Sequence, residues 1–152
     1  MTTTTNLTSP LLLVEDSDED YAALVRAFRQ AGINTPHHRC CDGDDALEYL
    51  RQSGRYANAE TAPRPSLILL DLNLPGTDGR EVLRAVKQDG ELSSVPVIVM
   101  TTSANPADIL ECYRQGANGY QVKTSNYDGF KREIQNTVDY WFHTAVIPAM
   151  VE

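Results

Sequence analysis

The segment ILLDLNLPGTDG, residues 68–79, decides the fold of this sequence. It begins inside a run of four apolar residues, 67–70, that stops at the carboxylate of Asp71. The positions that follow are rich in residues that favour turns: Asn73, Pro75, Gly76, Asp78 and Gly79. A short apolar run bounded by turn residues is typical of a strand buried on both faces of a parallel sheet. The segment therefore predicts a central strand that carries one carboxylate at its C-terminal end.

Apolar runs of similar length recur on both sides of this strand. They occupy residues 11–14, a weaker stretch at 37–41, residues 97–100 and residues 119–122. Helical patterns lie between them, so the chain is expected to contain five strand-and-helix units in succession. This succession predicts an α/β fold with a doubly wound, five-stranded parallel sheet and helices on both faces. Right-handed crossovers leave few topologies, and the common small one has the flavodoxin-like strand order 2-1-3-4-5.

The expected helices are marked by capping residues as well as by apolar spacing. The first begins with a capping-box pattern at Ser17 and Asp20. The second covers residues 44–52, and the fourth has Asn105 as N-cap with Pro106 in its first position. The last extends to about residue 143 and presents an apolar stripe of Phe130, Ile134, Val138 and Trp141.

The C-terminal ends of two strands bring acidic residues together. Strands 1 and 3 are neighbours in this order, so Glu15 and Asp16 at the end of strand 1 are expected beside Asp71. Carboxylates this close repel one another unless a proton or a cation neutralises them. Oxygen ligands, with a carbonyl added by Asn73, suit Mg²⁺ far better than zinc. A carboxylate beside Mg²⁺ can also accept a phosphoryl group as an aspartyl phosphate.

Two further strand ends complete the expected site. Strand 4 finishes in hydroxyl residues that begin with Thr101, and strand 5 ends at Lys123. Three acids, a hydroxyl and a lysine at one rim predict a phosphoryl-transfer site. Each of these residues also has an ordinary structural explanation. A hydroxyl residue before a helix can cap that helix, and most lysines lie on the surface in contact with solvent. The acids Asp18 to Asp20 are expected only to begin a helix, where negative charge favours the helix dipole.

Composition narrows the class of protein. The 152 residues fit one domain, expected over residues 10–144, with a disordered N-terminal tail at 1–9 and an apolar C-terminal tail at 145–152. A net charge of −8 with scattered Lys and Arg argues against a nucleic-acid partner. No signal peptide or membrane-spanning stretch is visible, and the three cysteines lack metal-ligand spacing. The expectation is a cytoplasmic protein with reduced thiols and no membrane association.

With these motifs in place, residues 11 to about 143 resemble the receiver domains of two-component response regulators. The motifs that carry the resemblance are LLLVEDS at 11–17, LILLDLNLPGTDG at 67–79, PVIVMTTS at 96–103 and GYQVK at 119–123. The resemblance implies a phosphoacceptor signalling protein rather than an enzyme acting on other substrates. Asp71 would take a phosphoryl group from the phosphohistidine of a histidine kinase. Mg²⁺ would be held by Asp16, Asp71 and the backbone carbonyl of Asn73, with Glu15 helping through water.

The resemblance also implies a switch. Lys123 would pair with the acceptor carboxylate and then with the phosphoryl group. Thr101 would move toward the phosphoryl oxygens, and Tyr120 would rotate into the space it leaves. The output surface would be the one formed by helix 4, strand 5 and helix 5. Most receivers have a proline after the lysine, commonly in a cis bond, whereas this chain has Thr124. A cis bond to a non-proline residue costs about 3 kcal/mol, which favours a trans bond and a differently shaped loop.

Three features are similar to the small stand-alone regulators paired with bacterial and cyanobacterial phytochromes. They are the long loop that begins at residue 53, the K-[ST]-x-N ending at 123–126 and the tail YWFHTAVIP at 140–148. This similarity implies a phytochrome-type kinase as partner and a homodimer through helix 4, strand 5, helix 5 and the C-terminal tail. The apolar tail has an equal alternative, in which it closes the end of the sheet.

Several other functions fit the sequence less well. A flavin or nucleotide domain of this fold would need a glycine- or hydroxyl-rich loop after strand 1, where this chain has EDSDED at 15–20. Mg²⁺-dependent phosphatases typically have an aspartate two positions after the nucleophile, where this chain has Asn73. Within these residues there is also no room for a helix-turn-helix domain after about residue 145. Two alternatives stay open: a phosphorelay intermediate that passes the phosphoryl group to another histidine, and a scaffold that works without phosphorylation.

Overall fold

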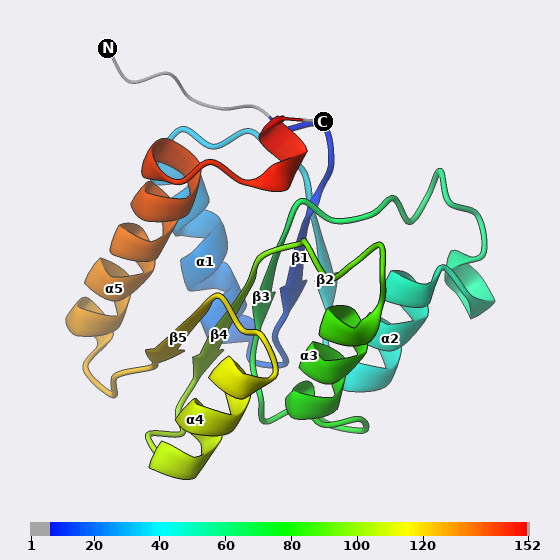
Figure 1. Cartoon of the computed structure of the whole chain (residues 1–152). Helices are drawn as coiled ribbons and strands as arrows, with labels where there is room; N and C mark the ends of the chain where they lie inside the picture. The colour runs from blue at the N-terminus through cyan, green and yellow to red at the C-terminus, as the bar shows by residue number, and fades with distance from the viewer. Residues whose placement is uncertain (1–6, 152) are drawn as a thin grey trace.

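The computed structural model describes residues 7–151 and contains a five-stranded parallel sheet (Figure 1). The strands are β1 (Leu11–Val14), β2 (His37–Cys40), β3 (Leu67–Leu70), β4 (Val97–Thr101) and β5 (Gly119–Val122). Their order in the sheet is β2-β1-β3-β4-β5, which confirms the predicted topology. In register, Val14 lies opposite both Cys40 and Leu70, so the neighbouring strands end at nearly the same level.

The helices connect the strands in the expected alternation. They are α1 (Asp18–Gln30), α2 (Gly43–Arg51), α3 (Gly79–Gln88), α4 (Pro106–Arg114) and α5 (Tyr127–Asp139). Three short helical segments accompany them: η1 (Gly54–Tyr56), the π-helical turn η2 (Tyr140–Thr144) and η3 (Pro148–Met150). The predicted N-caps at Ser17 and Asn105 accept backbone hydrogen bonds, from Asp20 and Ala107 respectively. The second helix begins and ends one residue earlier than predicted, because Asp42 caps it.

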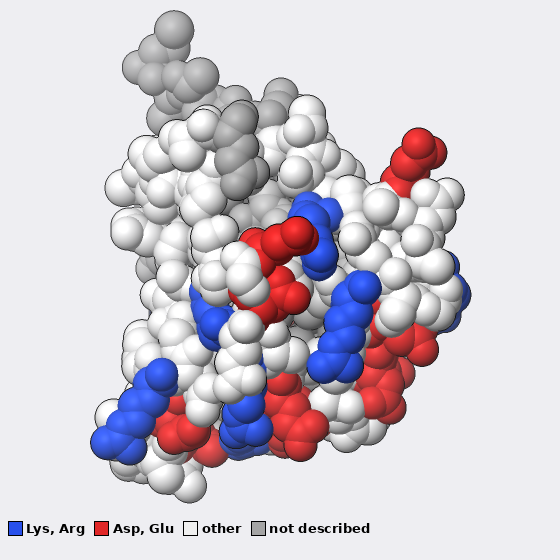
Figure 2. Space-filling view, turned by 45° about the vertical axis from the view of Figure 1, so that its right-hand side comes forward, with Lys and Arg blue, Asp and Glu red and all other residues white. Residues whose placement is uncertain are grey.

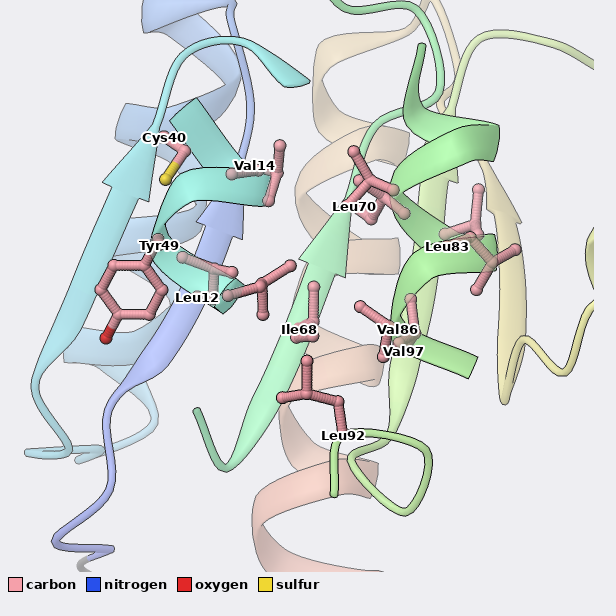
Figure 3. Packing of buried hydrophobic residues seen from close by; sticks show 14 of the residues in the cluster. Leu12, Val14, Cys40, Tyr49, Ile68, Leu70, Leu83, Val86, Leu92 and Val97 are labelled. Carbon is pink, nitrogen blue, oxygen red and sulfur yellow. The ribbon is translucent and has the colours of Figure 1, made fainter. Parts of the chain in front are cut away.

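The two faces of the sheet carry separate cores. Alternate residues of a strand point to opposite faces, and Leu12, Val14, Ile68 and Leu70 pack with residues of α2, α3 and α4. Figure 3 shows this packing, with the labelled side chains of β1 and β3 turned toward α2 and α3. The residues between them, such as Leu13 and Leu69, pack with α1 and α5 on the other face. Strands that are apolar on both faces therefore require helices on both faces, as the sequence indicated.

The chain ends pack more closely than predicted. Leu7, within the expected N-terminal tail, is buried, and its backbone N–H donates to Thr35 Oγ1 at 3.2 Å; residues 1–6 of that expected tail lie outside the described residues. At the other end, Phe142 is buried while Trp141 is only partly buried, so the apolar stripe of the last helix ends on Phe142. Ile147 is 2% exposed and joins the same core. Part of the apolar tail thus closes the end of the sheet.

Two local features shape the loops around the sheet's carboxyl edge. Gly79 begins α3 so close to β3 that a Cβ there would lie 2.2 Å from the Asp71 carbonyl oxygen. The Lys123–Thr124 peptide bond is trans, since the described residues contain no cis peptide bond. None of the helices described between residues 7 and 151 combines the length and the apolar character that crossing a membrane requires.

Candidate functional site

The predicted site residues meet where the strands end, at the lower edge of the sheet in Figure 1. Glu15 and Asp16 follow β1, Asp71 follows β3 and Lys123 follows β5. Thr101 is the last residue of β4 and lies opposite Val122 in register. Because these parallel strands end at nearly the same level, they bring residues that are far apart in the sequence to one edge of the sheet.

Lys123 is at the centre of this rim. Its ammonium nitrogen lies 2.6 Å from Glu15 Oε1, 2.8 Å from Asp20 Oδ2 and 2.9 Å from Asp71 Oδ2. The side chains of Lys123, Glu15 and Asp71 are only 7%, 5% and 9% exposed. Ion pairs this sheltered are screened little by salt, so the lysine neutralises much of the acidic charge.

The Asp71 carboxylate is held on both oxygens. Lys123 binds Asp71 Oδ2, and the backbone N–H of Asn73 donates to Oδ1 at 3.1 Å. Glu15 is held similarly, because its Oε2 accepts from the backbone N–H of Ser17 at 3.2 Å. The carboxylates are therefore oriented before any partner arrives.

Burial and charge change the protonation behaviour of this group of residues. Burial raises the pKa of Glu15 to about 7, against the opposing effect of the Lys123 ammonium. Burial alone would lower the pKa of Lys123, but its hydrogen bonds to Asp20, Glu15 and Asp71 outweigh that effect and raise it. Lys123 is therefore a permanent cation in this site, and the raised pKa of Glu15 lets this acid take up a proton near neutral pH.

Thr101 and Tyr120 lie on the β4 and β5 side of the site. Thr101 is fully buried, and its hydroxyl oxygen is 3.4 Å from Asn73 Nδ2. Tyr120 donates its hydroxyl hydrogen to the backbone carbonyl of Ser103 at 2.9 Å. The Ser103 hydroxyl in turn donates to Asp108 on α4 at 2.6 Å. Tyr120 is thus bonded to the same loop that begins beside Thr101.

The acids can also hold a divalent cation. One carboxylate oxygen from each of Glu15, Asp16 and Asp71 lies within 4.8 Å of the others. Asp16 is exposed, so this set opens to solvent. An all-oxygen donor set with one solvent-facing member fits Mg²⁺, which prefers carboxylates and retains several waters. Asn73, the fourth predicted contributor, adjoins them through its backbone bond to Asp71.

Asp20 is a site residue that sequence reasoning missed. The acids at 18–20 are expected from the sequence only to begin a helix, and they do form the first turn of α1. The Asp20 carboxylate, however, also binds Lys123. Asp20 lies in the first turn of α1, where its carboxylate reaches the Lys123 ammonium beyond the end of β5. No local sequence pattern reveals this contact. The capping box is also only half formed: the Ser17 hydroxyl accepts from the Asp20 N–H, but the Ser17 N–H donates to Glu15 Oε2 and not to Asp20.

Among the described residues on the face drawn in Figure 2, basic side chains do not gather into a patch of the kind that binds nucleic acid. On the face in Figure 2, Lys and Arg side chains are spread out and lie among acidic ones. The ion pairs Arg80–Asp108 at 2.9 Å and Arg64–Glu91 at 3.0 Å are examples of such mixing.

Comparison with known proteins agrees with this geometry. Residues 11–135 match the model of the response regulator receiver domain family. The response regulator Rcp1 of Synechocystis sp. is 40% identical over 139 residues, which are 91% of this chain and 92% of Rcp1. The crystal structure of its Mn²⁺-bound form superposes with a TM-score of 0.87 at 38% identity, covering 92% of this chain and 99% of that chain. The phosphorylated cyanobacterial phytochrome response regulator RcpA gives a TM-score of 0.86 at 39% identity, covering 93% and 99% of the two chains. By sequence and by structure, this chain belongs to the response regulator receiver domain family.

Proposed function

We propose that this protein is a single-domain response regulator that accepts a phosphoryl group on Asp71 from a histidine kinase. The observation that carries the proposal is the buried contact of Lys123 with Glu15, Asp20 and Asp71 at the carboxyl edge of the sheet. A carboxylate fixed beside a permanent cation is oriented for attack, and its product is an anion that the same cation stabilises. The protein thereby catalyses its own phosphorylation and dephosphorylation and acts on no other substrate.

In the proposed step, one Asp71 oxygen attacks the phosphorus of a phosphohistidine. A new O–P bond forms, the N–P bond breaks, and its electron pair returns to the kinase imidazole. Lys123 and the Asn73 N–H hold the carboxylate in place during the attack. The Thr101 hydroxyl, which lies beside Asn73, would then turn toward the phosphoryl oxygens.

Mg²⁺ would be held by Asp16, Asp71 and the Asn73 carbonyl, with Glu15 contributing through water. Bound there, it would offset the charge of the transferred phosphoryl group. The oxygen-only cluster of Glu15, Asp16 and Asp71 supports this assignment, and so does a relative whose structure is described as Mn²⁺-bound.

The proposed partner is a phytochrome-type histidine kinase. Support comes from RcpA, which is described as a phytochrome response regulator. A further neighbour, described as a bacteriophytochrome response regulator, is 33% identical with a TM-score of 0.74.

The phosphorylation proposal is tested by intact-mass measurement after incubation with acetyl phosphate. The wild type should gain about one phosphoryl mass in the presence of Mg²⁺ and none after chelation. Asp71→Asn should gain none under either condition. Glu19→Gln is the control, because it removes the charge of an exposed acid in the first turn of α1 and leaves Asp71 in place. It should gain the same mass as the wild type. A folded wild type that gains no mass would contradict the proposal and favour the phosphorylation-independent scaffold.

We propose that phosphorylation is read out by dimerisation through α4, β5, α5 and the C-terminal segment. Supporting this, α4 exposes Leu110 and Tyr113, which are 51% and 50% exposed, and Tyr127 and Tyr140 are exposed on and beside α5. Added charge at Asp71 would have to favour one arrangement of Thr101 and Tyr120, the residues that connect the site to this surface.

Analytical ultracentrifugation with and without acetyl phosphate tests this readout. The dimer fraction should change on phosphorylation in the wild type and not in Asp71→Asn. Leu110→Ser should reduce the dimer fraction, whereas Arg84→Ser, an exposed change on α3, should not. A mass distribution unchanged by phosphorylation would refute the dimer readout. If kinase and a second histidine protein then exchanged the phosphoryl group through Asp71, the phosphorelay alternative would be favoured.

A further inference from the structure

A second cluster of potential ligands lies between β2, α2 and η1. One ligand atom from each of His38, Cys40 and Asp45 lies within 4.8 Å of the other two. His38 and Cys40 are two residues apart on β2, so both side chains point to the same face of the sheet. That face is covered by α2, which supplies Asp45. Figure 3 shows Cys40 and Tyr49 together on this side of β2.

Contacts with aromatic residues hold two of the three side chains, His38 and Asp45, in place. The His38 ring stacks on Tyr49 with centroids 4.6 Å apart and an angle of 17° between the rings. His38 Nε2 is 3.1 Å from the Tyr56 hydroxyl, which donates to Asp45 Oδ1 at 2.8 Å. Arg55 also binds this Asp45 oxygen. Tyr56 therefore joins His38 to Asp45, and the ligand atoms face one another without long, flexible side chains.

The protonation state of His38 suits a bound cation, whereas Cys40 has to lose its proton when the cation binds. Burial lowers the pKa of His38, which keeps the ring neutral and able to donate a lone pair. Burial and the neighbouring Asp45 raise the pKa of Cys40, so its sulfur is a protonated thiol in the metal-free protein. A coordinated cation reverses this preference, because a thiol that binds a metal is deprotonated.

An acidic pocket borders the cluster at Asp45. It has a volume of about 360 Å³ and is lined by Asp42, Asp44, Asp45, Glu48, Gly54 and Arg55. Carboxylates outnumber the single guanidinium, so the pocket attracts cations. Asp45 belongs to both the pocket and the cluster. The Arg55 side chain is 65% exposed, which allows it to leave Asp45 without disturbing the core.

We propose that His38, Cys40 and Asp45 form a binding site for Zn²⁺. Nitrogen, thiolate sulfur and carboxylate oxygen are the donors that Zn²⁺ takes in proteins, and three protein ligands leave a fourth position for water or the Tyr56 hydroxyl. Mg²⁺ is excluded as the natural occupant by the sulfur and nitrogen donors. On binding, Cys40 releases its proton to solvent, and Zn²⁺ replaces Arg55 as the cation that neutralises Asp45. The bound ion would tie the edge strand β2 to α2, independently of phosphorylation at Asp71.

The test uses Co²⁺ as a spectroscopic probe of the reduced, full-length protein in excess Mg²⁺. Mg²⁺ occupies the oxygen-only cluster at Asp71, so that Co²⁺ reports on the new site. We expect one equivalent of Co²⁺ to produce a sulfur-to-cobalt charge-transfer band and tetrahedral visible bands, both removed by Zn²⁺. Cys40→Ser should abolish the charge-transfer band. His38→Gln and Asp45→Asn should each weaken Co²⁺ binding by at least roughly tenfold.

Matched controls separate this site from accidental binding. Cys41→Ser changes the exposed neighbouring thiol, His37→Gln changes the adjacent imidazole, and Asp71→Asn disables the other cluster; all three should retain the bands. Circular dichroism establishes whether each variant is folded. If Cys40→Ser does not fold, the proposal is tested by the Co²⁺ affinities of His38→Gln and Asp45→Asn. The proposal is overturned if folded wild type gives no charge-transfer band, or if the band is lost in Cys41→Ser. It is equally overturned if folded His38→Gln and Asp45→Asn bind Co²⁺ as tightly as wild type.

Discussion

At the scale of single residues, the acidic site depends on Lys123. Its ammonium contacts three carboxylates from residues that are 108, 103 and 52 positions away in the sequence. All three acids are partly shielded from water in the site, so the same Lys123 ammonium compensates the negative charge of each. Removing one partner of a buried ion pair leaves the other charge uncompensated, which is strongly destabilising.

Lys123→Met should therefore lower the free energy of unfolding of the metal-free protein by about 3 kcal/mol. Added Mg²⁺ should restore part of this loss, because a divalent cation neutralises the same acids. Urea unfolding with EDTA and then with Mg²⁺ measures both effects. Lys131→Met on α5 is the control and should change stability by less than about 0.5 kcal/mol. Equal stability of Lys123→Met and wild type in EDTA would contradict this account of the site.

Glu15 should make the metal-free protein less stable as pH rises. Folding raises its pKa from 4.5 to about 7, so between these values the folded state holds a proton that the unfolded state has released. The free energy of unfolding attributable to Glu15 is thus fully present below about pH 4.5 and falls as the pH rises to about 7. Relative to Glu15→Gln, wild type should lose roughly 2–3 kcal/mol across this range.

Urea unfolding at several pH values in EDTA checks this expectation. The comparison with Glu15→Gln is needed because burial lowers the pKa values of His37 and His38, whose contribution has the opposite slope. That contribution is common to both proteins and cancels. A stability difference that does not vary with pH would show that Glu15 is ionised throughout.

At the scale of secondary-structure elements, the start of α3 sets the shape of the loop that follows Asp71. Asp78 caps the helix by accepting from the Arg80 N–H, and the Gly79 N–H donates to the Leu72 carbonyl at 2.9 Å. A Cβ at position 79 would lie 2.2 Å from the Asp71 carbonyl oxygen and 2.6 Å from Leu72 Cα. Both neighbours are backbone atoms, so neither can move aside alone.

Gly79→Ala should accordingly destabilise the protein by about 2–3 kcal/mol. It should also slow phosphoryl uptake from acetyl phosphate, because the change displaces the loop that carries Asp71 and Asn73. Gly90→Ala is the matched control: a Cβ at that position meets nothing within 4 Å, and stability and uptake should stay near the wild-type values. Thermal unfolding and intact-mass time courses give the two readouts. If both alanine variants behaved alike, close packing at position 79 would not be what shapes the loop.

At the scale of the whole molecule, the C-terminal segment belongs to the core on the α1 and α5 face. Phe142 makes an edge-to-face contact with Phe28 of α1, with ring centroids 5.9 Å apart. Beyond it, Ile147 is 2% exposed, whereas its neighbour Val146 is 75% exposed. Two adjacent apolar residues of this segment therefore have opposite environments.

Ile147→Ala should lower the free energy of unfolding by about 2–3 kcal/mol, since it removes buried methyl groups and leaves a cavity. Val146→Ala should change it by less than about 0.5 kcal/mol. Urea unfolding of the two variants measures the contrast directly. Comparable, small effects would mean that the domain ends before this segment, at the expected residue 144.

The sequence by itself determined the alternation of strands and helices, the strand order and the motif around Asp71. Apolar runs, helix caps and turn residues act over a few positions, so they can be recognised without knowing the fold. The strand order then predicted that five site residues lie together at one edge of the sheet: Glu15, Asp16, Asp71, Thr101 and Lys123. Only the tertiary structure decided that Asp20 joins Lys123 and that Ile147 is buried. It also brought His38 and Cys40 to Asp45. These contacts depend on which side of each element faces the sheet after packing, because burial and charge neutralisation act between residues that share no local pattern.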